Sequence, residues 1–340
     1  MRKALNASVL TCLMCAACAS SPVRPEPSAV SLPAVPEDPL ALLVEAPDSV
    51  AVANVQALTG TSSFARLRPY IERAACVSLD DWASLLASTR RAALAARQKP
   101  EQSPEWLLLL AGRYTEADAG RLLAVAMRSS RGGDNEPARE ARDQAGRFAV
   151  TEQGELAVSV LEERVLVLGT KAWLHAALVS VSQPTGSFLG STLWRSVGVP
   201  LGCEARSACV LSAAHTQGAH QLERSLSSAG ARQVGQALES SDSALGLTFS
   251  NQLTLALAVQ LSSEETAQLA ERALRDWLWQ ANLVVRLTGL PAVLDRTRLS
   301  TQGAQLRGEL DVTAQELDAY DAKGRALLDR LPTSCDAQLL

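Results

Sequence analysis

The stretch LAVSVLEERVLVL at residues 156–168, followed by KAWLHAALVSV at residues 171–181, decides how this sequence folds. The first part contains two apolar runs of strand length on either side of Glu162-Glu163, which predicts a hairpin. The second part begins as soon as the second run ends and has the length and apolar spacing of a helix. The stretch therefore predicts a strand–turn–strand–helix unit.

The same order returns near the C-terminus. A predicted hairpin ends in the strand 305–312, and a predicted helix covers 314–331. A Ser or Thr with an acid three residues later is the signature of a capping box, in which the two side chains satisfy free N–H groups at a helix start. Three such starts occur: Thr115 with Asp118, Ser262 with Glu265, and Thr313 with Glu316. The second start opens a long predicted helix that reaches residue 285.

The other elements follow from apolar spacing and from turn residues. Residues 79–98 are expected to be helical, because Trp82, Leu85, Leu86 and Thr89 follow helical spacing, and residues 131–144 are expected to be a loop. Further strands are expected at 48–58, 106–111, 148–151, 210–213, 245–249 and 253–261, and further helices at 63–75, 115–128 and 217–239.

These elements predict an α+β protein with two related halves, each a mainly antiparallel sheet with helices packed on one face. The first α+β domain is expected to cover residues 40–183 and the second residues 188–334. Pro184 and Gly186 mark the boundary between them. The order of elements in this body is similar to that of uncharacterised exported bacterial proteins, a resemblance of architecture that implies no site and no activity.

The N-terminus has the features of a signal peptide over residues 1–17. Arg2 and Lys3 precede a mostly apolar segment at 4–17, which is about 21 Å long as a helix and too short for a bilayer core of about 30 Å. The sequence Cys15-Ala16-Ala17-Cys18 then resembles the lipobox of bacterial lipoproteins, although Cys15 stands where that family usually has Leu. The resemblance implies a lipid on the Cys18 thiol and cleavage just before it. Ordinary secretion without lipid and a buried N-terminal helix are the alternatives.

Residues 18–39 are expected to form a lipidated Cys and an extended tether. This segment contains Pro22, Pro25, Pro27, Pro33, Pro36 and Pro39, and proline disfavours helix both at its own position and before it. Some bacteria retain lipoproteins at the inner membrane through an Asp after the lipidated Cys, and Ala19 stands there instead. The resemblance therefore favours the outer membrane of the cell envelope, with the membrane as one partner through the N-terminal lipid.

Four cysteines remain beyond Cys18, in a compartment that permits disulfides. Cys203 and Cys209 are six residues apart and suit a small disulfide loop, which leaves Cys76 to pair with Cys335. Three connectivities exist, and the sequence does not choose among them. A buried free thiol at Cys76 is the alternative reading.

No pattern in the sequence indicates catalysis, a metal or a cofactor. His175 lies inside a predicted helix, and His215 and His220 are five residues apart, which does not suit two metal ligands on one helical face. The chain contains no Gly-x-Ser-x-Gly elbow and no glycine-rich phosphate loop. With 32 basic and 36 acidic residues, its charge of -4 does not favour nucleic acid as a partner.

Trp277 and Trp279 are the candidate interface residues. Two residues apart on a helix point about 200° away from each other, so we expect one to pack inside and the other to face a domain interface, a partner or an apolar groove. The first hypothesis is a lipid-anchored envelope protein that binds or scaffolds another protein without catalysis. The alternatives are a carrier of an apolar ligand such as a lipid, and a hydrolase with an unrecognised site.

Overall fold

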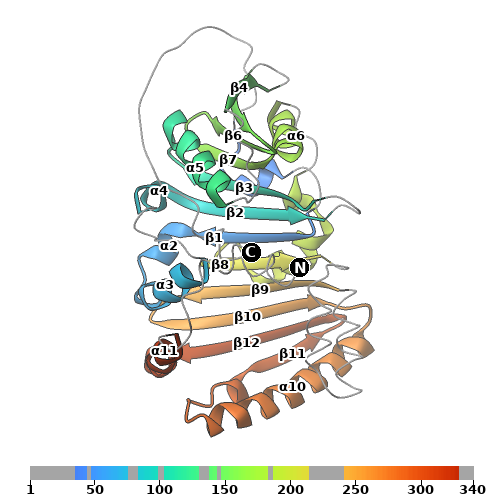
Figure 1. Cartoon of the computed structure of the whole chain (residues 1–340). Helices are drawn as coiled ribbons and strands as arrows, with labels where there is room; N and C mark the ends of the chain where they lie inside the picture. Colours follow the sequence, from blue (N-terminus) through green and yellow to red (C-terminus); the bar gives the residue numbers. More distant parts are fainter. Residues whose placement is uncertain are drawn as a thin grey trace. The chain divides into compact units, whose positions relative to one another are not determined.

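The computed structural model describes residues 35–43, 47–75, 83–98, 103–129, 138–143, 147–182, 187–213 and 241–328. These residues form two compact units, whose elements are labelled in Figure 1. Unit 1 contains the described residues up to Gln56 and those of Ile71–Ser191, and unit 2 contains Ala57–Tyr70 and the described residues from Thr192 onward. Residues 57–70, expected in the first domain, thus belong to unit 2. Helices α2 (Val55–Thr59) and α3 (Ser62–Ala75) contain the two crossing points.

Unit 1 is a twisted antiparallel sheet. Its strands follow the order β1-β2-β3-β7-β6-β5-β4, and every neighbouring pair is antiparallel. The strands are β1 (Ser49–Asn54), β2 (Thr89–Arg97), β3 (Glu105–Gly112), β4 (Arg139–Arg142), β5 (Ala149–Gln153), β6 (Leu156–Leu161) and β7 (Val165–Thr170). The helices are η1 (Pro39–Leu42), α4 (Ala83–Ser88), α5 (Glu116–Ser129), α6 (Lys171–Ser182) and η3 (Phe188–Gly190).

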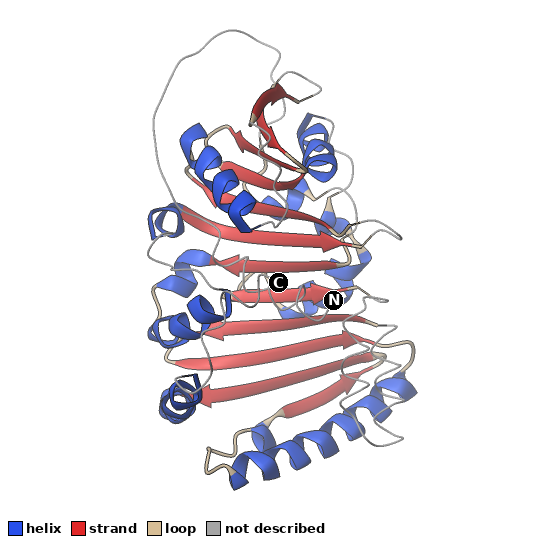
Figure 2. Ribbon diagram, viewed as in Figure 1, coloured by secondary structure: helices blue, strands red, loops and turns tan. Residues whose placement is uncertain are grey.

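Helices cover both faces of the central strands of unit 1. Leu108 and Leu166 pack with buried residues of α5, among them Leu122. The alternate residues of the same strands point the other way and are equally buried, and α6 contacts these strands with its own buried side chains, including Trp173. Figure 2 shows the two helices flanking β6 and β7. The mixed helix and antiparallel sheet confirms the α+β class, but the expectation of one covered face does not hold in this unit.

The predicted hairpin at 156–168 is confirmed. Strands β6 and β7 meet at a turn in which Glu162 and Glu163 have φ of 49° and 55°, a region that glycine occupies far more easily. The surrounding structure uses both residues: the Glu163 carbonyl accepts the Tyr114 N–H at 3.0 Å, and the Glu162 carboxylate accepts the Val35 N–H at 3.4 Å.

Residues 79–98 do not form the single helix expected from their spacing. Helix α4 ends at Ser88, and residues Thr89–Arg97 form β2 between β1 and β3. Ala93 pairs with Val52 on one side and with Leu109 on the other. The loop expected at 131–144 likewise contains a strand, β4, and the helix expected at 217–239 lies outside the described residues.

Unit 2 is a second antiparallel sheet, with the order β8-β9-β10-β12-β11. Its strands are β8 (Ala208–Ser212), β9 (Asp242–Phe249), β10 (Gln252–Gln260), β11 (Arg298–Gln302) and β12 (Gln305–Thr313). Its helices are η4 (Trp194–Gly198), α7 (Val199–Leu201), α10 (Glu264–Leu287), η5 (Leu294–Arg296) and α11 (Ala314–Leu328). Alternate residues of β10 and β12 pack against α10 and α11, while η4 and α7 contact β9 and β10.

Part of the succession of elements occurs in both units. In unit 1 the hairpin β2–β3 is followed by α5, by strands that end in the hairpin β6–β7, and by α6, with β7 paired to β3. In unit 2 the hairpin β9–β10 is followed by α10, the hairpin β11–β12 and α11, with β12 paired to β10. Helices α5 and α10 therefore hold corresponding places in the two chain paths.

Candidate functional site: the outward face of helix α10

Helix α10 begins at a side-chain cap. Ser263 is the N-cap residue, and its hydroxyl accepts the Thr266 N–H at 3.1 Å. Glu264 and Glu265 follow in the first turn, where acids are stabilised by the positive end of the helix dipole. A helix therefore begins here as predicted, but its N-cap residue is Ser263 and not Ser262.

A narrow stripe of α10 packs on the sheet. Ala267 and Ala270 are buried, and Leu274 is partly buried against Val259 and Leu306. Of the residues of α10 only Ala267, Ala270 and Asn282 are buried, so the helix contacts the rest of unit 2 over a small part of its circumference. The rest of its surface faces outward along β11 and β12 (Figure 1).

The end of α10 is set by a glycine. Gly289 has φ of 69°, which suits glycine, and its N–H reaches the Arg286 carbonyl at 2.9 Å. The Leu290 N–H reaches the Val285 carbonyl at 3.3 Å. This pair of hydrogen bonds is a Schellman motif, which satisfies free carbonyls in the last turn and stops the helix there.

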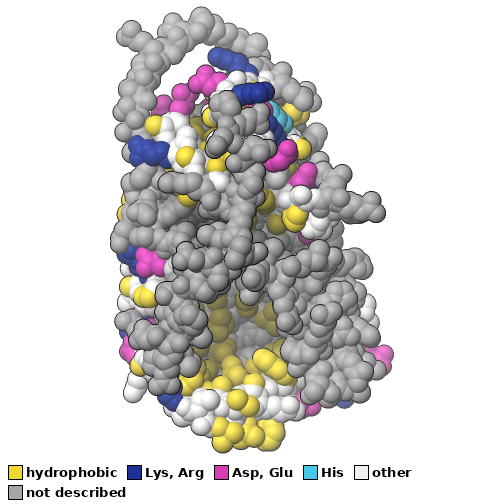
Figure 3. Space-filling model, in the orientation of Figure 1, with side chains coloured by type: hydrophobic (Ala, Val, Ile, Leu, Met, Phe, Trp, Pro, Cys, Tyr) yellow, Lys and Arg dark blue, Asp and Glu magenta, His cyan; other side chains and the backbone are white. Residues whose placement is uncertain are grey.

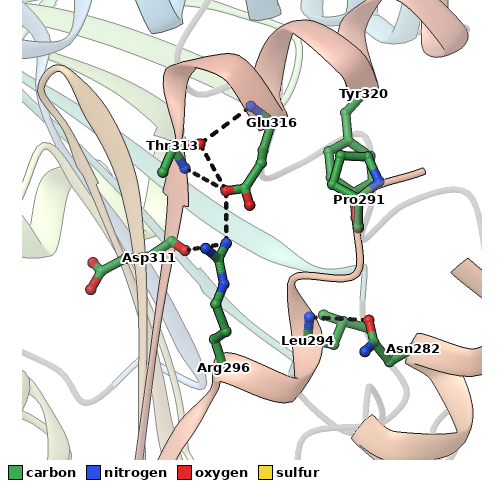
Figure 4. A network of polar contacts seen from close by, with 8 residues as sticks. All are labelled: Asn282, Pro291, Leu294, Arg296, Asp311, Thr313, Glu316 and Tyr320. Carbon is green, nitrogen blue, oxygen red and sulfur yellow. Dashed lines mark hydrogen bonds and ion pairs between the residues drawn. The ribbon is translucent and has the colours of Figure 1, made fainter. Parts of the chain in front are cut away.

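The segment after α10 is held on both sides. The buried Asn282 side chain accepts the Leu294 N–H at 3.3 Å, and the Tyr320 hydroxyl of α11 donates to the Pro291 carbonyl at 2.6 Å (Figure 4). Val293 is buried with residues of β12. These contacts attach the C-terminal half of α10 to the sheet and to α11.

Arg296 extends this network to the start of α11. Its guanidinium donates to the Glu316 carboxylate at 2.7 Å and to the Asp311 carbonyl at 3.2 Å (Figure 4). Burial acts to raise the pKa of Glu316, but the hydrogen bonds from Arg296 and Thr313 outweigh it and hold that pKa below its ordinary value. The Thr313 N–H donates to the Glu316 carboxylate at 2.9 Å, and the Glu316 N–H donates to the Thr313 hydroxyl at 3.3 Å. These two hydrogen bonds confirm the predicted capping box.

The C-terminal half of α10 exposes a continuous apolar surface, here called the outer face. The outer face consists of Trp277, Trp279, Leu283, Val284 and Leu287. Eight large hydrophobic side chains are exposed among the described residues, and six belong to α10: these five and Leu269. Figure 3 shows hydrophobic side chains gathered at the lower edge of the view, where Figure 1 places α10.

Neither tryptophan packs inside, contrary to the sequence analysis. Trp277 is 45% exposed and Trp279 is 67% exposed. They lie on opposite flanks of the outer face, because the stripe that contacts the sheet is too narrow to include either. Leu283, Val284 and Leu287 were not predicted as interface residues, although eight of the eleven residues 277–287 are apolar. In this last part of α10 the apolar residues therefore extend beyond the stripe that contacts the sheet.

The outer face is not a requirement of this chain path. Helix α5, which holds the corresponding place in unit 1, exposes Glu116, Gly120 and Ala124, and none of its described residues is an exposed large hydrophobic side chain. The apolar surface is therefore particular to α10. At roughly 300–600 Å², the largest apolar patch on an ordinary monomer is often functional.

The structure contains the disulfide between Cys203 and Cys209 that their spacing suggested. Both residues are buried, and their Cα atoms lie 5.5 Å apart. Gly202, with φ of 71°, makes the turn before Cys203. Cys18, Cys76 and Cys335 lie outside the described residues.

His175 of α6 is engaged by an acid. Its Nε2 lies 2.9 Å from Glu152, which also faces Lys171 at 3.3 Å. The hydrogen bond with His175 is the main reason why the pKa of Glu152 lies below its ordinary value. Within the described parts of the chain no three His, Cys, Asp or Glu side chains converge as metal ligands would, and His215 and His220 lie outside these parts.

Among the described helices, none combines the length and the apolar character needed to cross a membrane.

Comparisons with known proteins give a structural likeness alone. No family model and no curated protein matches the sequence. Solved structures of TP0453 in crystal forms III, IV and I cover 84% of this chain and 98%, 96% and 97% of their own. Their TM-scores are 0.48, 0.44 and 0.44, with 15%, 13% and 14% sequence identity. This likeness carries no information on function.

Proposed function

We propose that this chain is a lipid-anchored protein of the bacterial cell envelope that works by binding another protein through the outer face of α10. The observation that carries the proposal is the exposed apolar surface on a helix whose end is held by Asn282 and by the network around Arg296. A fixed helix with apolar side chains in successive turns is the shape that a groove or a second helix recognises. The partner is therefore a protein with an apolar helix or groove.

Two polar residues favour a protein over a lipid surface as the occupant. Asp276 and Gln280 are exposed on the same side of α10 as Leu283 and Leu287, since residues three or four apart on a helix lie on one face. Covering this face with hydrocarbon would desolvate a carboxylate and an amide without a partner. A protein can offer hydrogen-bond donors and acceptors at those two points.

The proposed location rests on the sequence of the first 39 residues, of which the structure describes only residues 35–39. Cys18 carries the lipid in this proposal, residues 18–39 act as the tether, and the outer membrane is favoured over the inner one. Intact mass and detergent partition of the wild type and of Cys18→Ala test it. Acyl mass and detergent partition confined to the wild type are expected, and equal behaviour of the two proteins would overturn the lipid anchor.

We further propose that the two units are related halves. The support is their common succession of hairpin, helix, hairpin and helix, in which the last strand returns to pair with the first hairpin. Their corresponding helices differ in function, since α10 has the outer face and α5 does not.

Photo-crosslinking in intact cells tests the binding function. A benzophenone amino acid replaces Leu283 on the outer face or, as the control, Gln268, which is exposed on the N-terminal half of the same helix. A discrete protein adduct at position 283 and none at position 268 is expected. Adducts to lipid alone at position 283, or equal adducts at both positions, would refute the proposal.

A further inference from the structure

The outer face of α10 has opposite charges at its two ends. Asp276 directly precedes Trp277, and Arg286 lies in the last turn beside Leu287. Ten residues separate the acid from the arginine, which is about 15 Å along a helix. A second α10 that runs in the opposite direction therefore matches both the apolar surface and the charges.

We propose that the protein bound by the outer face is a second copy of this chain, with the two α10 helices packed antiparallel about a two-fold axis at the level of Ala281. This inference rests on the proposed function and names its partner. Trp277 of each copy then meets Leu287 of the other, and Asp276 lies within a turn of the other copy's Arg286. A parallel pair would instead place Asp276 beside Asp276, which is repulsive.

The exposed area is sufficient for such a pair. Trp277 and Trp279 expose 45% and 67% of their surface, Leu283 49%, Val284 60% and Leu287 81%. With about 250 Å² for a whole Trp and about 100–150 Å² for Leu or Val, the outer face presents roughly 500 Å². If all five side chains were covered completely, two copies together would bury roughly 1,000 Å² before their polar flanks are added, which is about the threshold for a specific interface.

The charged flanks allow two copies to approach. Arg275 is paired with Glu271 at 2.6 Å, and Arg286 is paired with Asp295 at 2.9 Å. Because both arginines have an acid beside them in their own chain, the flanks of two identical faces do not repel each other strongly. Arg286 keeps most of its side chain exposed and can also receive the other copy's Asp276.

Gln280 lies close to the proposed axis and points outward from the middle of the outer face. A side-chain amide both donates and accepts, so the two Gln280 side chains can hydrogen-bond to each other. A single polar residue in an apolar helix seam is a common way to fix the register of two helices. This position is therefore the sharpest point for a test.

The test is disulfide trapping in the full chain carrying Cys18→Ala, so that acyl chains do not drive association. Gln280→Cys is compared with Gln268→Cys, the same change on an exposed position two turns or more from the axis, and with the parent chain without an added cysteine. After mild oxidation a covalent dimer is expected from Gln280→Cys alone. Sedimentation velocity should show a dimer of the parent chain, and Val284→Lys should weaken it at least tenfold.

Four outcomes would overturn the inference and separate it from the proposed function. A monomeric parent chain without trapping at position 280, together with a different protein crosslinked at position 283 in cells, overturns the second copy and leaves the binding function. A monomeric parent chain that binds phosphatidylethanolamine–phosphatidylglycerol vesicles, and loses this binding in Val284→Lys, overturns both the second copy and the protein-binding function. Equal trapping at positions 268 and 280 shows chance collision and refutes the pairing, while an unchanged dimer of Val284→Lys moves the interface elsewhere.

Discussion

Adding a single methyl group at Gly112 should destabilise unit 1 strongly. Gly112 ends β3, and its N–H donates to the Arg164 carbonyl at 2.8 Å. A Cβ atom at this position would lie 2.0 Å from the Ser88 carbonyl oxygen and 2.7 Å from the Tyr114 hydroxyl. An ordinary contact between carbon and oxygen is about 3.3 Å, so Ser88 would have to retreat by roughly 1.3 Å.

The neighbours of Gly112 cannot retreat cheaply. The Ser88 carbonyl accepts the Arg113 N–H at 3.3 Å, and the Tyr114 hydroxyl donates to the Thr89 hydroxyl at 2.9 Å. Overpacking of this kind usually costs about 1–3 kcal/mol, and a clash with backbone belongs at the upper end. We expect Gly112→Ala to lower the free energy of unfolding by about 3 kcal/mol.

Gly120 provides the matched control in the same unit. It is exposed inside α5, and a Cβ atom there would have nothing within 4 Å. Gly120→Ala should therefore raise the free energy of unfolding by about 1 kcal/mol, the difference in helix propensity between the two residues. With a urea dependence of about 2 kcal/mol per M, the two unfolding midpoints should differ by roughly 2 M.

Urea unfolding, followed by circular dichroism and by tryptophan fluorescence, measures both variants. Gly112→Ala with a midpoint close to that of the wild type would refute the close approach of β3 to Ser88. Equal shifts of the two variants in the same direction would show that glycine content, and not local space, decides the outcome.

Three other predictions concern local structure. Ser263→Ala should lower the free energy of unfolding by about 1 kcal/mol, and Ser262→Ala by less than about half of that. If thermal unfolding shows the larger loss for Ser262→Ala, Ser262 is the N-cap residue of α10. Glu163→Gly should raise the free energy of unfolding by about 1 kcal/mol, because a positive φ is unfavourable for Glu163 and not for glycine. A lower free energy of unfolding would contradict this reading of the turn. Because its pKa is held low in the folded state, Glu316 stabilises unit 2 above about pH 4.3, and this contribution is lost as the pH falls through its folded pKa. The stability difference between the wild type and Glu316→Gln should therefore shrink between pH 6 and pH 2, and a constant difference would contradict it.

The local features of this protein could be predicted from the sequence. The capping boxes of Thr115 with Asp118 and of Thr313 with Glu316 form as expected, as does the hairpin around Glu162 and Glu163. In each case the interacting residues are close in the chain, so short-range spacing contains the whole signal. The antiparallel α+β class follows from these units.

Features that depend on distant neighbours could not be predicted in this way. Residues Thr89–Arg97 include four alanines, which favour helix in isolation, but their backbone pairs with β1 on one side and β3 on the other. Two ladders of hydrogen bonds in a buried sheet outweigh a propensity difference of a few tenths of a kcal/mol per residue. The helical spacing from Trp82 to Thr89 therefore predicted α4 correctly, but the extension of that helix to residue 98 was wrong.

The candidate site divides in the same way. Three of its features follow from the period of a helix and could be predicted: α10 exists, it begins near Ser262, and Trp277 and Trp279 point in different directions. The exposure of both tryptophans beside Leu283, Val284 and Leu287 depends instead on tertiary packing. Helix α10 packs at the edge of the unit 2 sheet through Ala267, Ala270 and Leu274, and this stripe is too narrow to cover the apolar residues of its C-terminal half.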